Sequence, residues 1–224
     1  MLRGNHEFLS MCAEYGFASE CAVKLNEQLF NSFIQSFQYI PLCAIIGKTF
    51  CVHGGISNKI NSLEDISKIS KVQIEKIDGV ETDLLWSDPS QDVDGFEPNA
   101  RGVGCVFGSD ALDHFLDCCG FIRVIRAHEF CETGCKAMFG NDQKVITVFS
   151  SYDYCGKYNN AGIVRIDENE NIEMDSFSPL DVKESSRVRT CLIGYGSIFP
   201  KVNPIDKNEI LNVKKDFKPD LIEI

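Results

Sequence analysis

The sequence lacks a long hydrophobic run. Its most apolar stretch, from Ile40 to Val52, is interrupted by Lys48 and is far shorter than the ~18 residues that a membrane-spanning helix needs. The first residues, Met1 to Glu7, contain no apolar segment of the kind found in a secretory signal peptide. We therefore expect a soluble protein with no membrane partner, in the cytoplasm and with the nucleus as a second location.

Positive charge is also scarce. The chain has 22 Lys and Arg residues against 33 Asp and Glu residues, which gives a net charge of −11 and an isoelectric point near 4.8. Nucleic acids attract clusters of basic residues, so no nucleic-acid partner is expected. With 224 residues, 44% of them hydrophobic, the chain is long enough to bury one substantial core, and a disordered chain is excluded.

Cysteine, by contrast, is abundant, but its pattern excludes a disulfide scaffold. The eleven cysteines are odd in number and irregularly spaced, apart from Cys118-Cys119 and the pair Cys131 and Cys135. The adjacent Cys118 and Cys119 are poor co-ligands for one tetrahedral zinc ion. Reduced and mostly buried thiols are therefore predicted.

Hydrophobic periodicity predicts a mixed α/β chain. Apolar residues between 19 and 39 recur at the spacing of one helix face, and Pro41 ends that helix. A capping box at Ser62 predicts a short helix through Ile69, and a second helix is predicted over 109–119, with Ser109 as its cap and Gly120 as its stop. The predicted strands cover residues 42–46 and 49–52 as a hairpin, then 121–125, 144–149 and 161–166.

The composition and periodicity of the sequence change near residue 180. Four of the seven prolines (Pro179, Pro200, Pro204 and Pro219) lie in the last 46 residues, and no long periodic run occurs there. We predict one domain over residues 1–180 and a tail with limited structure over 181–224.

The four histidines supply the first functional indication. His6, His53 and His128 lie in loops or directly after strand-like segments, where side chains from several strands meet in one cleft. His114 lies in a predicted helix without a partner motif, and we interpret it as structural. Two imidazoles and the amide oxygen of Asn5 form a mixed donor set that suits Mn²⁺, Fe²⁺ or Zn²⁺.

Six short motifs follow one another along the chain. They are Leu2-Arg3-Gly4-Asn5-His6-Glu7, His53-Gly54-Gly55-Ile56-Ser57, Leu85-Trp86-Ser87-Asp88-Pro89, Arg101-Gly102-Val103 with Phe107-Gly108, Arg126-Ala127-His128, and Phe149-Ser150 with Tyr154-Cys155-Gly156. In this order they resemble the catalytic half of the metal-dependent serine/threonine protein phosphatases of the phosphoprotein phosphatase family, most closely the type 1 and type 2A group. The resemblance covers about residues 1–180.

The resemblance implies a fold and a reaction. The fold would be α/β, a metallophosphoesterase β-sandwich flanked by helices, here lacking its N-terminal strands. The reaction would be hydrolysis of phosphoserine and phosphothreonine in proteins by a metal-activated water, which needs neutralisation of a highly charged transition state. Phosphoprotein substrates and regulatory subunits are the implied partners.

The resemblance also assigns roles to individual residues. Asn5, His53 and His128 correspond to ligands of the second of two metal ions, either manganese or an iron/zinc pair. His6 corresponds to the general acid, a role that suits an imidazole. Arg101 corresponds to a phosphate-binding arginine, whose planar fork can hold two oxygens, and Tyr154 would line the cleft beside it.

Two aspartate motifs of the family, Gly-Asp-x-His-Gly and Gly-Asp-x-Val-Asp-Arg-Gly, are missing from the sequence. In relatives they provide the ligands of the first metal, the bridging carboxylate and a second phosphate-binding arginine. We therefore expect an N-terminally truncated catalytic domain that retains only second-site ligands, is inactive on its own and tends to aggregate.

Four further expectations concern loops. Trp86 to Pro89 is predicted to pack under the site rather than supply catalytic groups, and the acidic residues Asp92, Asp94 and Glu97 would favour basic phosphopeptides. The segment Asp167 to Glu173 is unlike the apolar docking strand of type 1 enzymes. Cys155, with no cationic neighbour in the sequence, is not expected to be a nucleophile.

Two alternatives remain open. The first is a non-catalytic pseudophosphatase that binds phosphopeptides or regulatory subunits through Arg101 and part of the metal cleft. The second is a different metallophosphoesterase, such as a dinucleotide polyphosphate hydrolase. The motifs at Trp86 to Pro89 and Arg101 to Gly108 count against the second.

Overall fold

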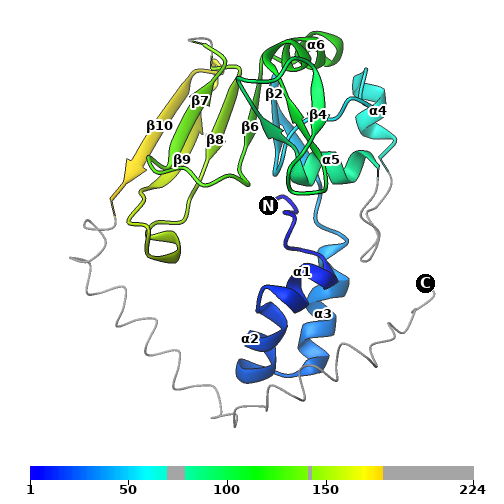
Figure 1. The fold of residues 1–224 in the computed structure, drawn as a ribbon, viewed down its shortest axis with the longest axis vertical. Coiled ribbons are helices and arrows are strands. Elements are labelled where there is room, and N and C mark those ends of the chain that lie inside the picture. The colour runs from blue at the N-terminus through cyan, green and yellow to red at the C-terminus, as the bar shows by residue number, and fades with distance from the viewer. Residues whose placement is uncertain (70–78, 141–142, 179–224) are drawn as a thin grey trace.

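A computed structural model describes residues 1–69, 79–140 and 143–178. The helical part of the chain lies on one side of a sheet-bearing part, and the N-terminus lies between the two (Figure 1). The predicted tail, 181–224, lies outside the described residues.

Three helices form the N-terminal unit: α1 (Leu9–Glu14), α2 (Phe17–Lys24) and α3 (Glu27–Phe37). The single helix predicted for residues 19–39 is wrong, because the chain leaves helical geometry at Leu25 and starts again at Asn26, whose side chain accepts a hydrogen bond from the Leu29 amide at 2.8 Å. The break lets α2 and α3 pack on each other around a small separate core of Cys12, Cys21, Phe30 and Ile34.

A five-stranded sheet forms the centre of the fold, in the order β1-β2-β6-β8-β7. The predicted hairpin is confirmed, with β1 (Cys43–Ile46) antiparallel to β2 (Thr49–Val52). Strand β2 is parallel to β6 (Arg123–Arg126), and β6 is parallel to β8 (Val145–Val148). The edge strand β7 (Cys135–Met138) then runs antiparallel to β8. Parallel β2, β6 and β8 bring their carboxyl ends to one edge of the sheet.

Helices cover one face of this sheet. They are α4 (Leu63–Ser67), α5 (Val80–Trp86) and α6 (Ser109–Cys119), and a small sheet of β3 (Asp88–Pro89), β5 (Cys105–Phe107) and β4 (Phe96–Pro98) lies beside them. The main core fills the space between Phe50 on β2, Leu112 on α6 and Phe107 on β5, which are all fully buried. Burial of so many apolar side chains is the main force that holds these layers together.

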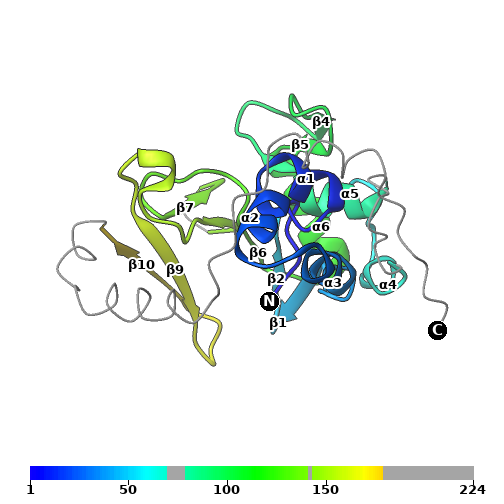
Figure 2. The same cartoon turned by 90° about the horizontal axis from the view of Figure 1, so that it is seen from below.

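On the other side, β9 (Ala161–Ile166) and β10 (Ile172–Phe177) form an antiparallel hairpin that contacts β7 and β8. Seen from below, α1, α2 and α3 lie in front of the sheet, while this hairpin stands at the far side of β7 (Figure 2). The acidic segment beginning at Asp167 forms the turn of the hairpin, with the Asp167 carboxylate accepting hydrogen bonds from the Asn169 and Asn171 amides.

Two helix boundaries differ from the prediction. Helix α6 has Gly108 rather than Ser109 at its N-cap, and no side chain makes a capping hydrogen bond there. The Asp110 carboxylate, in the first turn, accepts a hydrogen bond from the Gly95 amide. The predicted stop of α6 is confirmed, since Gly120 ends the helix in the left-handed conformation that glycine tolerates best. Helix α4 begins at its predicted cap, Ser62, but ends at Ser67.

The ten cysteines that the structure describes are all free thiols, and only Cys118 and Cys155 are exposed. The prediction of reduced cysteines is confirmed for this part of the chain, whereas the prediction that most are buried is not, because four are buried, four half-buried and two exposed. Burial raises the pKa of Cys12, Cys105 and Cys119 to about 11, which disfavours thiolate formation. None of the described helices combines the length and apolar character of a membrane span.

The capping bond at Asn26 is testable. Asn26→Ala removes the acceptor for the Leu29 amide, so we expect the free energy of unfolding to fall by about 1 kcal/mol, measured by urea denaturation. Asn26→Ser, which restores a capping oxygen, is the control and should recover most of the loss. An Asn26→Ala protein as stable as the parent would show that packing alone fixes the start of α3.

Candidate active site

Parallel pairing of β2 and β6 places two of the predicted ligands side by side. Thr49 to Cys51 pair with Arg123 to Ile125, so His53 and His128 leave the carboxyl ends of neighbouring strands. The Ala127 amide donates to the His53 carbonyl oxygen at 2.9 Å and continues the pairing past the strands. The two imidazole centres lie 5.1 Å apart. This is the edge of a parallel sheet at which ligand sites usually form.

A short loop brings Asn5 to the same place. The Arg3 amide donates to the Pro41 carbonyl, and the fully buried Arg3 guanidinium folds back to donate to the Glu7 carbonyl from Nη2 at 2.8 Å. The Glu7 carboxylate in turn accepts from the Gly4 amide at 2.7 Å. A side chain at Gly4 would lie 3.1 Å from the His53 ring, so glycine is needed there for the close approach.

Asn5, His53 and His128 together fit a divalent metal ion. The Asn5 Oδ1 atom lies 2.8 Å from His53 Nε2, and His128 Nε2 is buried with no hydrogen-bond partner. Burial lowers the pKa of His53 to about 4, helped by the charge of Arg126, and burial lowers the pKa of His128 to about 3. Both imidazoles are therefore neutral near pH 7, which is the state in which histidine binds a metal.

Arg126, the last residue of β6, organises the floor of this site. Its side chain is completely buried and donates to the Gly54 carbonyl, to the Ser87 carbonyl at 3.1 Å and to the carboxylates of Asp88 and Glu129, both at 2.7 Å. These partners come from the ends of β2, α5 and β6. One guanidinium thus joins three segments that are far apart in the sequence.

Asp88 links this buried group to the predicted phosphate ligand. One carboxylate oxygen accepts a hydrogen bond from Arg126. The other accepts from Arg101 Nε at 2.8 Å and from the side-chain Nδ2 of Asn99 at 2.9 Å. Burial alone would raise the pKa of Asp88, but the hydrogen bond from Arg101 and the charge of Arg126 outweigh it and lower the pKa. Asp88 is therefore a carboxylate that fixes the direction of the Arg101 side chain.

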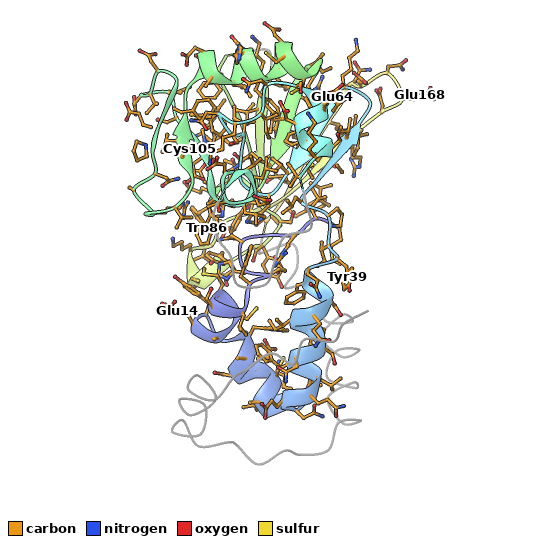
Figure 3. The ribbon with its side chains drawn as sticks, turned by 90° about the vertical axis from the view of Figure 1, so that its right-hand side faces the viewer. Glu14, Tyr39, Glu64, Trp86, Cys105 and Glu168 are labelled. Carbon is orange, nitrogen blue, oxygen red and sulfur yellow. The ribbon has the colours of Figure 1, made fainter. Side chains whose placement is uncertain are left out.

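Trp86 to Pro89 was predicted to pack under the site, and it does so. The prediction was incomplete because Asp88 also orients Arg101. Trp86 does pack at the site, with its ring edge-to-face against His128 at 5.5 Å. Figure 3 shows Trp86 between Cys105, in the sheet-bearing part, and Glu14, in the helical unit. Asp88 was missed because its partners, Arg101 and Arg126, are 13 and 38 residues away in sequence. An acidic residue between Ser and Pro gives no local signal of such pairing.

The two remaining predicted residues lie at the rim. His6 is exposed, and its ring contacts Tyr15 edge-to-face at 5.0 Å. Tyr154 lies in the short helix η1 (Tyr154–Gly156) of the β8–β9 loop and is 46% exposed. Its ring packs against Phe149, which contacts Phe130, two residues beyond His128.

A pocket of about 240 Å³ adjoins the site. Its walls are the segment after Asp88 and the segment after His128, together with Lys136 and Met138 of β7 and Thr147 of β8. Asp92 and Lys136 both line it, so it presents charges of both signs.

Comparison with known proteins agrees with this geometry. The model of the calcineurin-like phosphoesterase family matches residues 1–132. A solved structure, described as a protein serine/threonine phosphatase from Saccharomyces cerevisiae with similarity to human phosphatase PP5, aligns with a TM-score of 0.70 and 32% sequence identity. That alignment covers 79% of this chain and 59% of the yeast chain.

The fold and the site thus define a metallophosphoesterase. The chain belongs to the calcineurin-like phosphoesterase family, and within it to the phosphoprotein phosphatases. The predicted α/β metallophosphoesterase fold is confirmed. The family comprises hydrolases of phosphoesters, which generally use divalent metals.

Loss of Asp88 is expected to be severe. Asp88→Ala removes one of the two carboxylates that neutralise the fully buried Arg126, so we expect the free energy of unfolding to fall by about 3 kcal/mol, measured by urea denaturation. Asp92→Ala, a nearby carboxylate in the exposed loop, is the matched control and should change it by less than about 0.5 kcal/mol. Equal effects of the two substitutions would contradict the structural role of Asp88.

The two half-buried histidines, His53 and His128, predict a pH dependence in the metal-free chain. Their folded pKa values, about 4 and 3, lie below the unfolded value of about 6.5, so between these limits the unfolded chain binds more protons. Stability is therefore complete above about pH 6.5 and falls with decreasing pH, by about 2 kcal/mol per imidazole near pH 5. Denaturation in a chelator at several pH values measures this loss. A His53→Gln/His128→Gln protein should lose much less, and an unchanged slope would refute the assignment.

Proposed function

We propose that the chain provides the second-metal and phosphate-binding part of a protein serine/threonine phosphatase, which hydrolyses phosphoserine and phosphothreonine. One observation supports this most directly. The donor atoms of Asn5, His53 and His128 converge, and Arg101 is fixed beside them through Asp88, which is bound to the arginine of the strand that leads to His128. A metal site and an oriented phosphate ligand thus share one framework.

Asn5, His53 and His128 would hold the second ion of a two-metal centre. The proposed metals of that centre are manganese or an iron/zinc pair. When bound, the ion supplies Lewis acidity and positive charge at the phosphoryl group. The protein's own part is to present neutral imidazoles and an amide oxygen, a donor set that suits such ions. Trp86, packed on His128, restricts the motion of that ring.

Arg101 would bind the phosphoryl oxygens. Its Nε is already bound to Asp88, which leaves the terminal nitrogens for a ligand, and its side chain is 40% exposed. A guanidinium fixed before substrate arrives offers stabilisation without reorganisation, the condition under which a donor contributes most to catalysis.

His6 would donate the proton to the departing seryl or threonyl oxygen. Its exposure at the rim, one residue after Asn5, fits a group that reaches the substrate rather than the metal. Tyr154, exposed in the β8–β9 loop, would contact the peptide around the phosphorylated residue. Phosphoprotein substrates, regulatory subunits and a cytoplasmic location are part of the proposal.

The pocket beside the site modifies the proposed preference for basic phosphopeptides. Asp92 lines it and would attract basic side chains, whereas Lys136, which also lines it, would attract acidic ones. We propose that basic residues are favoured near Asp92 only. Turnover of phosphopeptides that differ at one flanking position tests this, and equal rates would contradict it.

Arg101→Ala tests the phosphate role. In a catalytic domain completed with the two aspartate motifs of the family, we expect the substitution to remove about 2–4 kcal/mol of transition-state stabilisation, the scale for one preorganised donor. The measurement is the ratio of kcat/KM values of parent and variant for a phosphoserine peptide. Direct binding of a non-hydrolysable phosphopeptide to the chain of 224 residues distinguishes the proposed enzyme from the alternative, a non-catalytic pseudophosphatase. Arg101-dependent binding there, with no turnover in the completed domain, would favour a pseudophosphatase.

His6→Asn tests the role of the proposed acid. We expect it to lower kcat in the completed domain by about 10²-fold or more, while metal content, measured by elemental analysis, stays at the parental level. His53→Ala is the comparison and should lose metal. If His6→Asn loses metal as completely as His53→Ala, His6 is a ligand and the assignment is wrong.

A further inference from the structure

Helix α6 presents a histidine and a cysteine to solvent on the side of the helix that does not contact the core. Its apolar residues, among them Leu112, Phe115 and Leu116, are buried, whereas His114 and Cys118 are exposed. Being four residues apart, the two side chains lie one above the other on the helix surface. The Cys118 Sγ atom lies 3.5 Å from His114 Nε2 and 3.7 Å from His114 Nδ1.

This separation matches that of two ligands on one zinc ion. A Zn–S bond of about 2.3 Å and a Zn–N bond of about 2.0 Å, at a tetrahedral angle of about 109°, place sulfur and nitrogen about 3.5 Å apart. The Nε2 atom of His114 lies at this distance from the sulfur, and Nδ1 lies slightly farther, at 3.7 Å. Both side chains are exposed, so they can reorient to direct one nitrogen lone pair and the sulfur at a shared ion without moving the helix.

The surroundings leave this pair available. Two carboxylates of α6 are engaged elsewhere, since Asp113 binds Lys144 at 2.8 Å and Asp110 accepts from the Gly95 amide, whereas Asp117, directly before Cys118, is exposed. Cys119, the neighbour of Cys118, is buried against the core, so it cannot join. Among the residues described, no third His, Cys, Asp or Glu completes a cluster, so water would fill the other positions.

We propose that His114 and Cys118 form a two-ligand surface site for a soft or borderline divalent ion, Zn²⁺ in particular, separate from the phosphatase site. A thiolate and an imidazole are the ligands that zinc prefers, whereas Mg²⁺ and Ca²⁺ select oxygen. The site is therefore selective against the common hard cations.

Residue-specific alkylation tests the proposal on the chain of 224 residues. The parent and a His114→Gln variant are treated with iodoacetamide, with and without ZnCl₂, and the modification rate of each cysteine is measured by peptide mass spectrometry. Cys155, also exposed but without a described histidine contact, is the internal control. Because the readout is confined to single thiols, zinc bound at His53 and His128 does not interfere with it.

Zinc at about ten times the dissociation constant should slow alkylation of Cys118 by about tenfold, by mass action. Cys155 should be unaffected, and the effect at Cys118 should disappear in His114→Gln, while MgCl₂ should protect neither thiol. Unchanged alkylation of Cys118 with zinc would overturn the proposal, as would equal protection of Cys155. Full protection in His114→Gln would also overturn it, because the imidazole would then not be a ligand.

Discussion

The contact between Arg126 and Asp88 is the constraint on which the rest of the site depends. A guanidinium with no solvent exposure is tolerated only when its charge is paired and its donors are satisfied, and the chain satisfies Arg126 with two carboxylates and two carbonyl oxygens. Those partners belong to the segments after β2, α5 and β6. The electrostatic need of one side chain therefore fixes the ends of three elements relative to one another.

Close backbone packing beneath this pair requires glycine. The Gly54 amide donates to the Leu84 carbonyl at 2.8 Å, and a side chain at Gly54 would lie 2.5 Å from the Leu85 backbone. The glycine loop after β2 thus lets the end of α5 lie against the end of the strand. Without this approach, neither the Ser87 carbonyl nor Asp88 would reach Arg126.

Much of this framework could be predicted from the sequence, because it depends on local patterns. Alternating and continuous apolar runs predict β2, β6 and β8, and the position of His53 and His128 directly after strands predicts a shared cleft. The division of the predicted N-terminal helix into α2 and α3 could not be predicted from periodicity, because the hydrophobic spacing reports which face is buried and not whether the chain turns at Asn26. Pairing of Asp88 with two distant arginines depends on topology, to which hydrophobic patterns do not respond.

The proximity of His114 to Cys118 could not be predicted for a similar reason, because it depends on the structure and not on a local motif. From the sequence, Cys118 was considered as a ligand only together with the adjacent Cys119, and His114 was interpreted alone as structural. Helix geometry instead brings residues i and i+4 together, so the imidazole and the thiol meet although neither lies in a recognised motif. A pair of ligands at this spacing can be found in a sequence only after the helix and its exposed face are known.

Backbone strain at His128 connects this proposed metal ligand to the proposed phosphate ligand, Arg101. His128 has a positive φ of 65°, a conformation that persists in a non-glycine residue only when its surroundings enforce it. Its neighbours enforce it, because the Ala127 amide is bound to the His53 carbonyl and the Glu129 carboxylate to Arg126. Arg126 also holds Asp88, which orients Arg101. The proposed metal and phosphate ligands therefore share one network, and the effects of substitutions at Glu129 and at Asp88 should be non-additive, as expected for residues with a common partner.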